Sequence, residues 1–334
     1  MDEWLIYQGT GEPDPDRMAL LPAAPEWRRF DGEGSYDVPP VDSTTLRRLG
    51  GLDAGTPPVH RDHTVNMVNA ALYLRRPLLV TGQPGTGKST LAHAVAYELG
   101  LGRVLQWSIV SRTSLKDGLY QYDALGRLQD SQLASGDGKP TDDIGRYIRL
   151  GPLGTALIAA DRPRPLLIDE LDKSDIDLPN DLLHVLEDGE FTIPELERIA
   201  DRQPEVTVLT DDGGRVVVKE GRVRCRAFPF IVITSNGERD FPPALQRRCL
   251  ALELSPPNSE QIAALVQAHF GRGEDARHGE LIQRFLDGDD TGGARPADQL
   301  LNAIFLVNGP AGADALRRGE LLEMLMRPID PRHG

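Results

Sequence analysis

The chain has 334 residues, of which 40% are hydrophobic and 26% are charged, and its net charge is -14. This composition fits a globular protein of roughly two domains and argues against broad, non-specific binding to nucleic acid or anionic membranes. No apolar run approaches the length of a membrane span and the acidic start lacks a signal pattern, so we expect a cytoplasmic protein without membrane segments.

Residues 1–42 are rich in proline, glycine and acidic residues but also carry aromatic side chains, namely Trp4, Tyr7, Trp27, Phe30 and Tyr36. Disordered tails are usually poor in aromatic residues. We therefore expect an extended arm that docks on a neighbouring molecule or on its own body. A weakly ordered leader is the alternative.

A strand, a glycine-rich loop and a helix follow one another in residues 77–99. The apolar run 77–81 leads into Gly82, Gln83, Pro84, Gly85, Thr86, Gly87, Lys88, Ser89 and Thr90, which contain the phosphate-loop pattern GxxxxGK[ST]. Glycines let the backbone wrap closely around phosphates, and N–H groups at a helix start favour anions. We expect Lys88 to reach the β and γ phosphates of ATP and the Ser89 hydroxyl to bind Mg²⁺.

Further short apolar runs at residues 104–109, 166–168, 230–234 and 250–254 alternate with helical stretches. This alternation predicts a mostly parallel sheet with helices on both faces. Residues 113–150 are glycine- and tyrosine-containing and are interpreted as loop and hairpin rather than core. Residues 205–228 predict a hairpin that turns at 211–214.

Beyond residue 257 helical patterns predominate, at residues 259–270, 279–286, 297–307 and 313–326. We therefore divide the chain into an arm (1–42), an α/β core (43–256) and an all-helical lid (257–334).

Polar side chains end the later strands. The run 165–168 ends in Asp169 and Glu170, where the first carboxylate can hold hydrated Mg²⁺ and the second can polarise the attacking water. Asn236 follows the strand at 230–234 and is suited to orient that water. The alternatives are that Asp169 and Glu170 are solvated acids at a strand end and that Asn236 simply caps its strand.

Arg247 and Arg248 lie where a short helix leads into the last strand. A cation there cannot easily reach the phosphates bound to its own chain, but in a ring it could reach those of a neighbour. It would then act as an arginine finger that stabilises transition-state charge. A surface salt bridge is the alternative.

The segments 167–173, 179–183, 186–191 and 234–236 together resemble MoxR-type AAA+ ATPases over about residues 58–325. The resemblance implies that Asn236 is the sensor 1 residue, that Arg248 is the preferred finger with Arg247 second, and that Arg295 is the sensor 2 arginine of the lid. It also implies that residues 119–122 form a substrate-gripping loop in a central channel, with simple packing of the tyrosines as the alternative.

We accordingly expect an AAA+ P-loop NTPase core with a parallel five-stranded sheet of order 5-1-4-3-2, a C-terminal all-helical lid, and ATP and Mg²⁺ bound at the interfaces of a homo-oligomer, a hexamer. Such a protein would remodel or assemble a protein partner. Alternatives are a regulatory switch that gates a separate protease or nuclease and, less favoured by the negative charge, a nucleic-acid motor. The arm lies outside the family core, and we interpret it as a docking peptide for the adjacent protomer or a dedicated partner.

Overall fold

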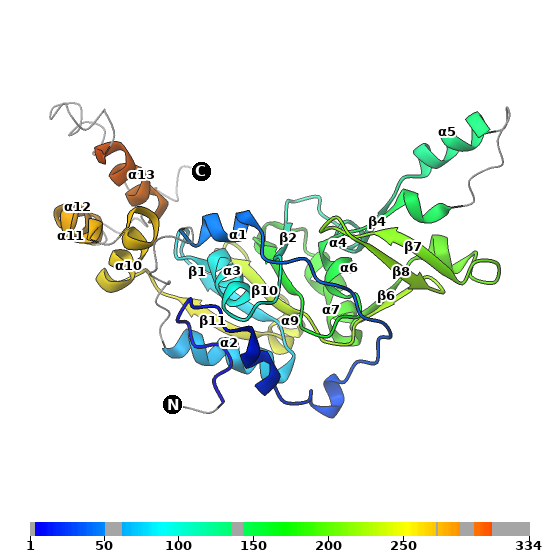
Figure 1. The fold of residues 1–334 in the computed structure, drawn as a ribbon, viewed down its shortest axis with the longest axis horizontal. Helices are drawn as coiled ribbons and strands as arrows, with labels where there is room; N and C mark the ends of the chain where they lie inside the picture. Colours follow the sequence, from blue (N-terminus) through cyan, green and yellow to red (C-terminus); the bar gives the residue numbers. More distant parts are fainter. Residues whose placement is uncertain (1–3, 51–61, 135–142, 272, 288–296, 309–334) are drawn as a thin grey trace.

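The computed structural model describes residues 4–50, 62–134, 143–271, 273–287 and 297–308 (Figure 1). A parallel sheet lies at its centre, built from β1 (Leu78–Gly82), β2 (Leu105–Ser108), β5 (Pro165–Asp169), β10 (Phe230–Ser235) and β11 (Leu250–Leu254). The spatial order is β11-β1-β10-β5-β2. Counted along the chain among these five strands, this is the predicted order 5-1-4-3-2.

Side chains alternate between the two faces of this sheet and build two separate apolar clusters. Leu78 and Val80 pack in one cluster with α2 (Asp62–Leu74) and α3 (Lys88–Glu98). Leu79 belongs to the other, which includes α6 (Pro152–Ala156) and α7 (Leu178–Asp188). The three inner strands β1, β5 and β10 are buried on both faces and form nearly continuous apolar runs, whereas the edge strands β2 and β11 alternate between buried and more exposed residues.

A second sheet lies beside the first and contains β3 (Tyr120–Tyr122), β4 (Ile148–Leu150), β6 (Glu190–Thr192), β7 (Glu205–Leu209), β8 (Arg215–Lys219) and β9 (Arg222–Arg224). The predicted hairpin is confirmed: β7 and β8 pair antiparallel, with Val206 opposite Val218. α8 (Pro194–Glu197) precedes the hairpin, and α9 (Pro243–Arg248) leads into β11.

Residues 113–150 contain the predicted antiparallel pairing, between β3 and β4, but the expectation that they lie outside the core was wrong. They form α4 (Leu115–Leu119), β3, α5 (Ala124–Ala134), η3 (Ile144–Tyr147) and β4. Leu119, Tyr120 and Ile148 are buried in the main apolar cluster, and the Tyr120 hydroxyl donates to Glu195 at 2.8 Å. Leu119 and Tyr120 are therefore packing residues and not an exposed gripping loop. The strands are three residues long, too short to show a period in the sequence.

The N-terminal arm packs on the body of its own chain (Figure 1). The buried Glu98 carboxylate, at the end of α3, accepts backbone N–H groups of Gln8 (2.7 Å), Gly9 (3.1 Å) and Gly11 (3.0 Å). The Arg17 guanidinium, in η1 (Pro15–Leu20), donates to the same carboxylate at 3.3 Å. The described part of the arm thus docks on the body of its own chain, which is one of the two positions that we expected for it, and contact with a neighbouring molecule stays a prediction.

Arg28, in η2 (Glu26–Arg28), fixes the arm a second time. Its buried guanidinium donates to the carbonyls of Arg75 (2.8 Å) and Leu186 (3.1 Å) and lies over the Phe228 ring, 4.4 Å from the centroid. The arm then continues to α1 (Ser43–Arg48).

The lid comprises α10 (Ser259–Phe270), α11 (Glu274–Arg277), α12 (Gly279–Asp287) and α13 (Ala297–Asn308), and it lies at the opposite end of the molecule from α5 (Figure 1). It has an apolar cluster of its own, which includes Ile262, Phe285 and Ile304. The helix predicted at residues 313–326 lies outside the described residues. Within the described ranges no helix is both long and apolar enough to span a membrane.

Candidate functional site

The phosphate-loop motif joins β1 to α3. Gly87 caps α3 in the left-handed region, with φ of 85°, and Gly82 has φ of 148°. A Cβ atom on Gly82 would lie 2.5 Å from the carbonyl oxygen of Leu254 on β11. Both positions therefore require glycine, and the loop can present its backbone to a ligand at the helix N-terminus.

Lys88 is the first residue of α3 and its side chain folds over the loop. Its Nζ donates to the carbonyls of Gly82 (2.7 Å) and Gln83 (2.9 Å). Burial lowers the pKa of Lys88, whereas Asp172, Asp169 and then Glu170 act to raise it. The amine thus lies at the loop among carboxylates, where it can meet phosphate oxygens.

Three hydroxyl and carboxylate groups meet at the carboxyl ends of β5 and β10. The Ser89 and Thr234 hydroxyls both donate to Oδ1 of Asp169, each at 2.7 Å. The parallel register of β5 with β10 brings the two strand ends together. Ser89 and Asp169, predicted as a pair, are therefore in direct contact.

Glu170 immediately precedes η4 (Leu171–Lys173) and has a left-handed backbone, with φ of 62°. Its N–H donates to the Thr234 hydroxyl at 2.9 Å, and its Oε2 accepts from Lys173 Nζ at 2.8 Å. This hydrogen bond with Glu170 raises the pKa of Lys173. Because both side chains are about 40% exposed, the pair contributes little to stability and can open.

A cavity of about 620 Å³ surrounds these groups, within the size range of small-molecule sites. One wall is the phosphate loop with Asp169, Glu170 and Asn236. The opposite walls come from α1, α2 and the lid, and include Arg48, Leu49, His63, Thr64, Gln261, Leu265, Ala268, His269 and Leu301.

Residues 77–249, just over half of the chain, match the sequence model of the AAA domain, dynein-related subfamily. The chain belongs to this AAA family. It is accordingly an ATPase, and its phosphate loop and acidic strand end are the parts expected to bind and hydrolyse the nucleotide. No curated protein matches the chain.

The sequence alone did not single out two polar residues of this AAA ATPase site. Thr234 joins Asp169 to the backbone of Glu170. The buried Asp172 accepts the N–H of Asn236 at 2.9 Å and fixes the loop after β10. A threonine at the end of an apolar strand is the one signal that could have pointed to Thr234.

Asn236 lines the cavity, and its role in orienting the attacking water stays a prediction. Arg295, predicted on the lid, lies outside the described residues. Ser89 and Asp169 offer the oxygen ligands that Mg²⁺ prefers, and such ions usually bind one or two carboxylates together with substrate phosphates. The described residues contain no group of three or more histidine, cysteine or acidic side chains that could hold a metal.

Arg247 and Arg248, at the end of α9, are not among the residues that line the cavity. Arg248 Nε pairs with Glu187 of α7 at 2.8 Å, whereas Arg247 is exposed and makes no ion pair within the part of the chain that the structure describes. Arg76 donates to the backbone carbonyls of both residues and holds the helix end in place.

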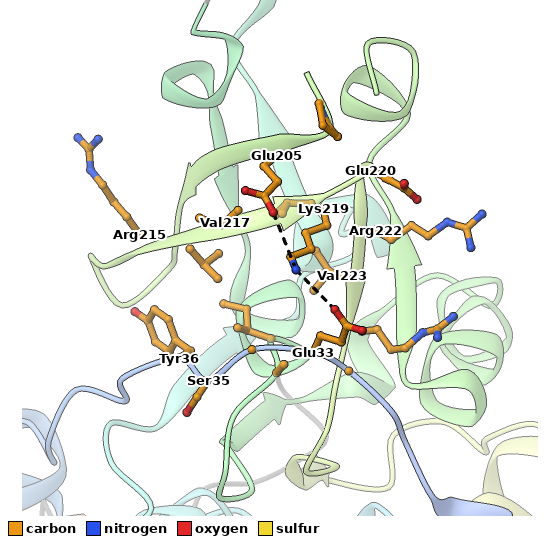
Figure 2. A pocket seen from close by; sticks show the side chains of 18 of the residues that line it. Glu33, Ser35, Tyr36, Glu205, Arg215, Val217, Lys219, Glu220, Arg222 and Val223 are labelled. Carbon is orange, nitrogen blue, oxygen red and sulfur yellow. Dashed lines mark hydrogen bonds and ion pairs between the residues drawn. The ribbon is translucent and has the colours of Figure 1, made fainter. Parts of the chain in front are cut away.

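A larger cavity, of about 1200 Å³, lies between the arm and the hairpin of the second sheet (Figure 2). Lys219 lies between Glu33 (3.5 Å) and Glu205 (3.9 Å) there. None of the phosphate-loop, Asp169 or Glu170 groups lines it. The smaller cavity is therefore the candidate nucleotide site.

Proposed function

We propose that this ATPase is a MoxR-like protein that assembles into a hexameric ring and hydrolyses ATP at its protomer interfaces to remodel or assemble a protein partner. The observation that carries the proposal is the position of Arg247 and Arg248 outside the cavity of their own chain. A phosphoryl-transfer site gains a large rate factor from an arginine, which a neighbouring molecule can supply. A second protomer is the simplest source.

Within the site, Ser89 and Asp169 would hold Mg²⁺, which supplies charge neutralisation to the phosphates when bound. Glu170 accepts a proton from the attacking water, and Asn236 orients that water. Lys88 stabilises the negative charge of the leaving phosphates. Thr234 keeps Asp169 and Glu170 in register.

Arg248 remains our first choice for the finger and Arg247 the second. The ion pair of Arg248 with Glu187 is 40% and 52% exposed, so its rupture costs only about 0–1 kcal/mol. Arg248 can therefore turn from Glu187 to a neighbour's phosphate at small cost.

The kind of partner on which the ATPase acts is inferred from the family resemblance and from the net charge. The segments shared with MoxR-type proteins support action on a protein partner, and the net charge of -14 disfavours a polyanionic one. The two cysteines are free and buried, and burial raises their thiol pKa to about 12, which fits a reducing cytoplasm.

Light scattering of the Glu170→Gln protein with and without Mg-ATP tests the ring. We expect a shift from a small species to about six subunits with ATP, because the variant retains nucleotide without turnover. Lys88→Ala, which should not bind nucleotide, is the matched control and should not shift. A Glu170→Gln protein that stays monomeric with bound ATP would contradict the ring.

Mixing experiments test the finger. Arg248→Ala and Lys88→Ala proteins should each be inactive, and a mixture should recover part of the ATPase rate if one protomer lends its arginine to another. Absence of recovery from mixed rings at every ratio counts against the shared site.

A further inference from the structure

The short helix α1 is fixed to the helix that follows the phosphate loop. Asp42 caps α1 by accepting the Thr45 N–H at 2.9 Å. The buried Thr45 hydroxyl in turn meets Nδ1 of His93 on α3, also at 2.9 Å. The position of α1 is therefore set by the same helix that carries Lys88 and Ser89.

Arg48, the last residue of α1, is half-buried and lines the nucleotide cavity. Its guanidinium donates to Oε1 of Gln106 at 3.2 Å, and Nε2 of Gln106 donates to Oδ2 of Asp169 at 3.5 Å. Arg48 thus lies two hydrogen bonds from Asp169, on the side of the cavity where Asp169 contacts Ser89.

The charge of Arg48 has no carboxylate partner among the described residues. Gln106 is its one hydrogen-bond acceptor there, although a guanidinium has five N–H donors. The neighbouring His93 brings no second positive charge at neutral pH, because burial first and Arg48 next lower its pKa to about 4. A half-buried cation that has no carboxylate partner among the described residues is suited to an anionic ligand.

The residues after Arg48 connect this edge of the site to the lid. Leu49 also lines the cavity. Gly50 has φ of 94°, and a Cβ atom there would lie 2.6 Å from the carbonyl oxygen of Ala268 in α10. The end of α1 is thus held between α3 of the core and α10 of the lid, and Arg48 lines the cavity from this fixed position.

We propose that Arg48 binds the terminal phosphate of ATP from within the same chain. It does so next to Asp169 and Ser89, and it is distinct from Arg247 and Arg248, which lie outside the cavity. The inference rests on the ATPase activity of the chain and not on its assembly into a ring. Arg48, which precedes the matched AAA domain, would then help the protein to distinguish ATP from ADP.

The test is the ratio of dissociation constants for ADP and ATP, measured by calorimetry with Mg²⁺ in the full-length Glu170→Gln protein. Arg48→Gln should lower this ratio about 10- to 100-fold, as expected for loss of a charged hydrogen bond to the γ-phosphate. Arg47→Gln is the matched control: Arg47 is exposed in the same helix, and its removal should leave the ratio within about twofold.

Arg48→Lys provides a second variant that keeps the charge, and its ratio should fall between those of the parent and Arg48→Gln. An unchanged ratio in Arg48→Gln, whether both affinities stay or both fall equally, would overturn the assignment. Light scattering of the same proteins separates this proposal from that of the hexameric ring. If the proteins do not assemble with ATP, the ring is contradicted, whereas the effect of Arg48→Gln on the ratio of dissociation constants can still be measured.

Discussion

Glu98→Gln should release the first part of the arm while leaving the nucleotide site intact. Glu98 is fully buried, and its carboxylate accepts three backbone N–H groups and the Arg17 guanidinium. It ends an 11-residue helix whose first residue is Lys88. At 1.5 Å per residue, the two ends of that helix are about 15 Å apart.

The size of the effect follows from the four contacts. Oε1 accepts from Gln8, Gly9 and Arg17, and a neutral amide oxygen in its place weakens each of these bonds by about 1 kcal/mol. Oε2 accepts from Gly11 and becomes an NH₂ group that faces another donor, so this bond is lost. The docking free energy of the arm should fall by about 3–5 kcal/mol, allowing for non-additivity.

Hydrogen exchange followed by mass spectrometry measures this directly. A loss of about 3 kcal/mol speeds exchange of the amides of Gln8, Gly9 and Gly11 about 100-fold. Glu12→Gln removes one charge from an exposed position of the arm and should leave exchange unchanged. An increase of less than about threefold in Glu98→Gln would refute the reasoning, and the ATPase rate should stay within about twofold of the parent.

Two further changes address the site and the second sheet. Thr234→Val removes the hydroxyl that joins Asp169 to the Glu170 N–H, and we expect kcat to fall about tenfold, with most of the rate retained in Thr234→Ser; an unchanged kcat would contradict this role. Asp212→Asn breaks a fully buried ion pair with Arg164 (2.7 Å) and should cost about 3–5 kcal/mol of unfolding free energy in urea titrations, whereas a cost below about 1 kcal/mol would mean that the pair is dispensable. Burial raises the pKa of Asp212, but its hydrogen bonds and Arg164 lower it more, so that the pKa lies below its ordinary value of 3.8. The ionised Asp212 therefore stabilises the fold fully above pH 3.8, and this stabilisation is lost as the pH falls further. The Asp212→Asn protein should lack this part of the pH dependence of the unfolding free energy.

The central sheet and the phosphate loop could be predicted because their signals are local. The run 230–234 corresponds to β10 (Phe230–Ser235), since a strand buried on both faces is apolar throughout. The loop needs glycine where φ is positive, as at Gly87, and a lysine and a hydroxyl at the helix start, so its chemistry is contained in eight consecutive residues.

The remaining features depend on single contacts between distant residues, which leave no period in the sequence. Tyr120 is buried because it packs in the main apolar cluster, where Glu195 accepts its hydroxyl. Arg48 lines the candidate nucleotide cavity because α1 is fixed by contacts with distant residues, such as that of Thr45 with His93, 48 residues later. Neither contact is signalled by composition or spacing, and the same holds for the contact of the arm with Glu98.

The contacts between Glu98 and the arm also determine when the arm can fold during synthesis of the chain. Gln8 leaves the ribosome 90 residues before the carboxylate that holds it, which is a delay of about 5–18 s at 5–20 residues per second. Ile6 and Tyr7 belong to the same apolar cluster as Val68 and Leu91. The nascent arm must therefore wait, with its apolar side chains uncovered, at least until α2 and α3 have emerged, and its cluster is complete only once β10 and β11 have supplied Val232 and Leu252.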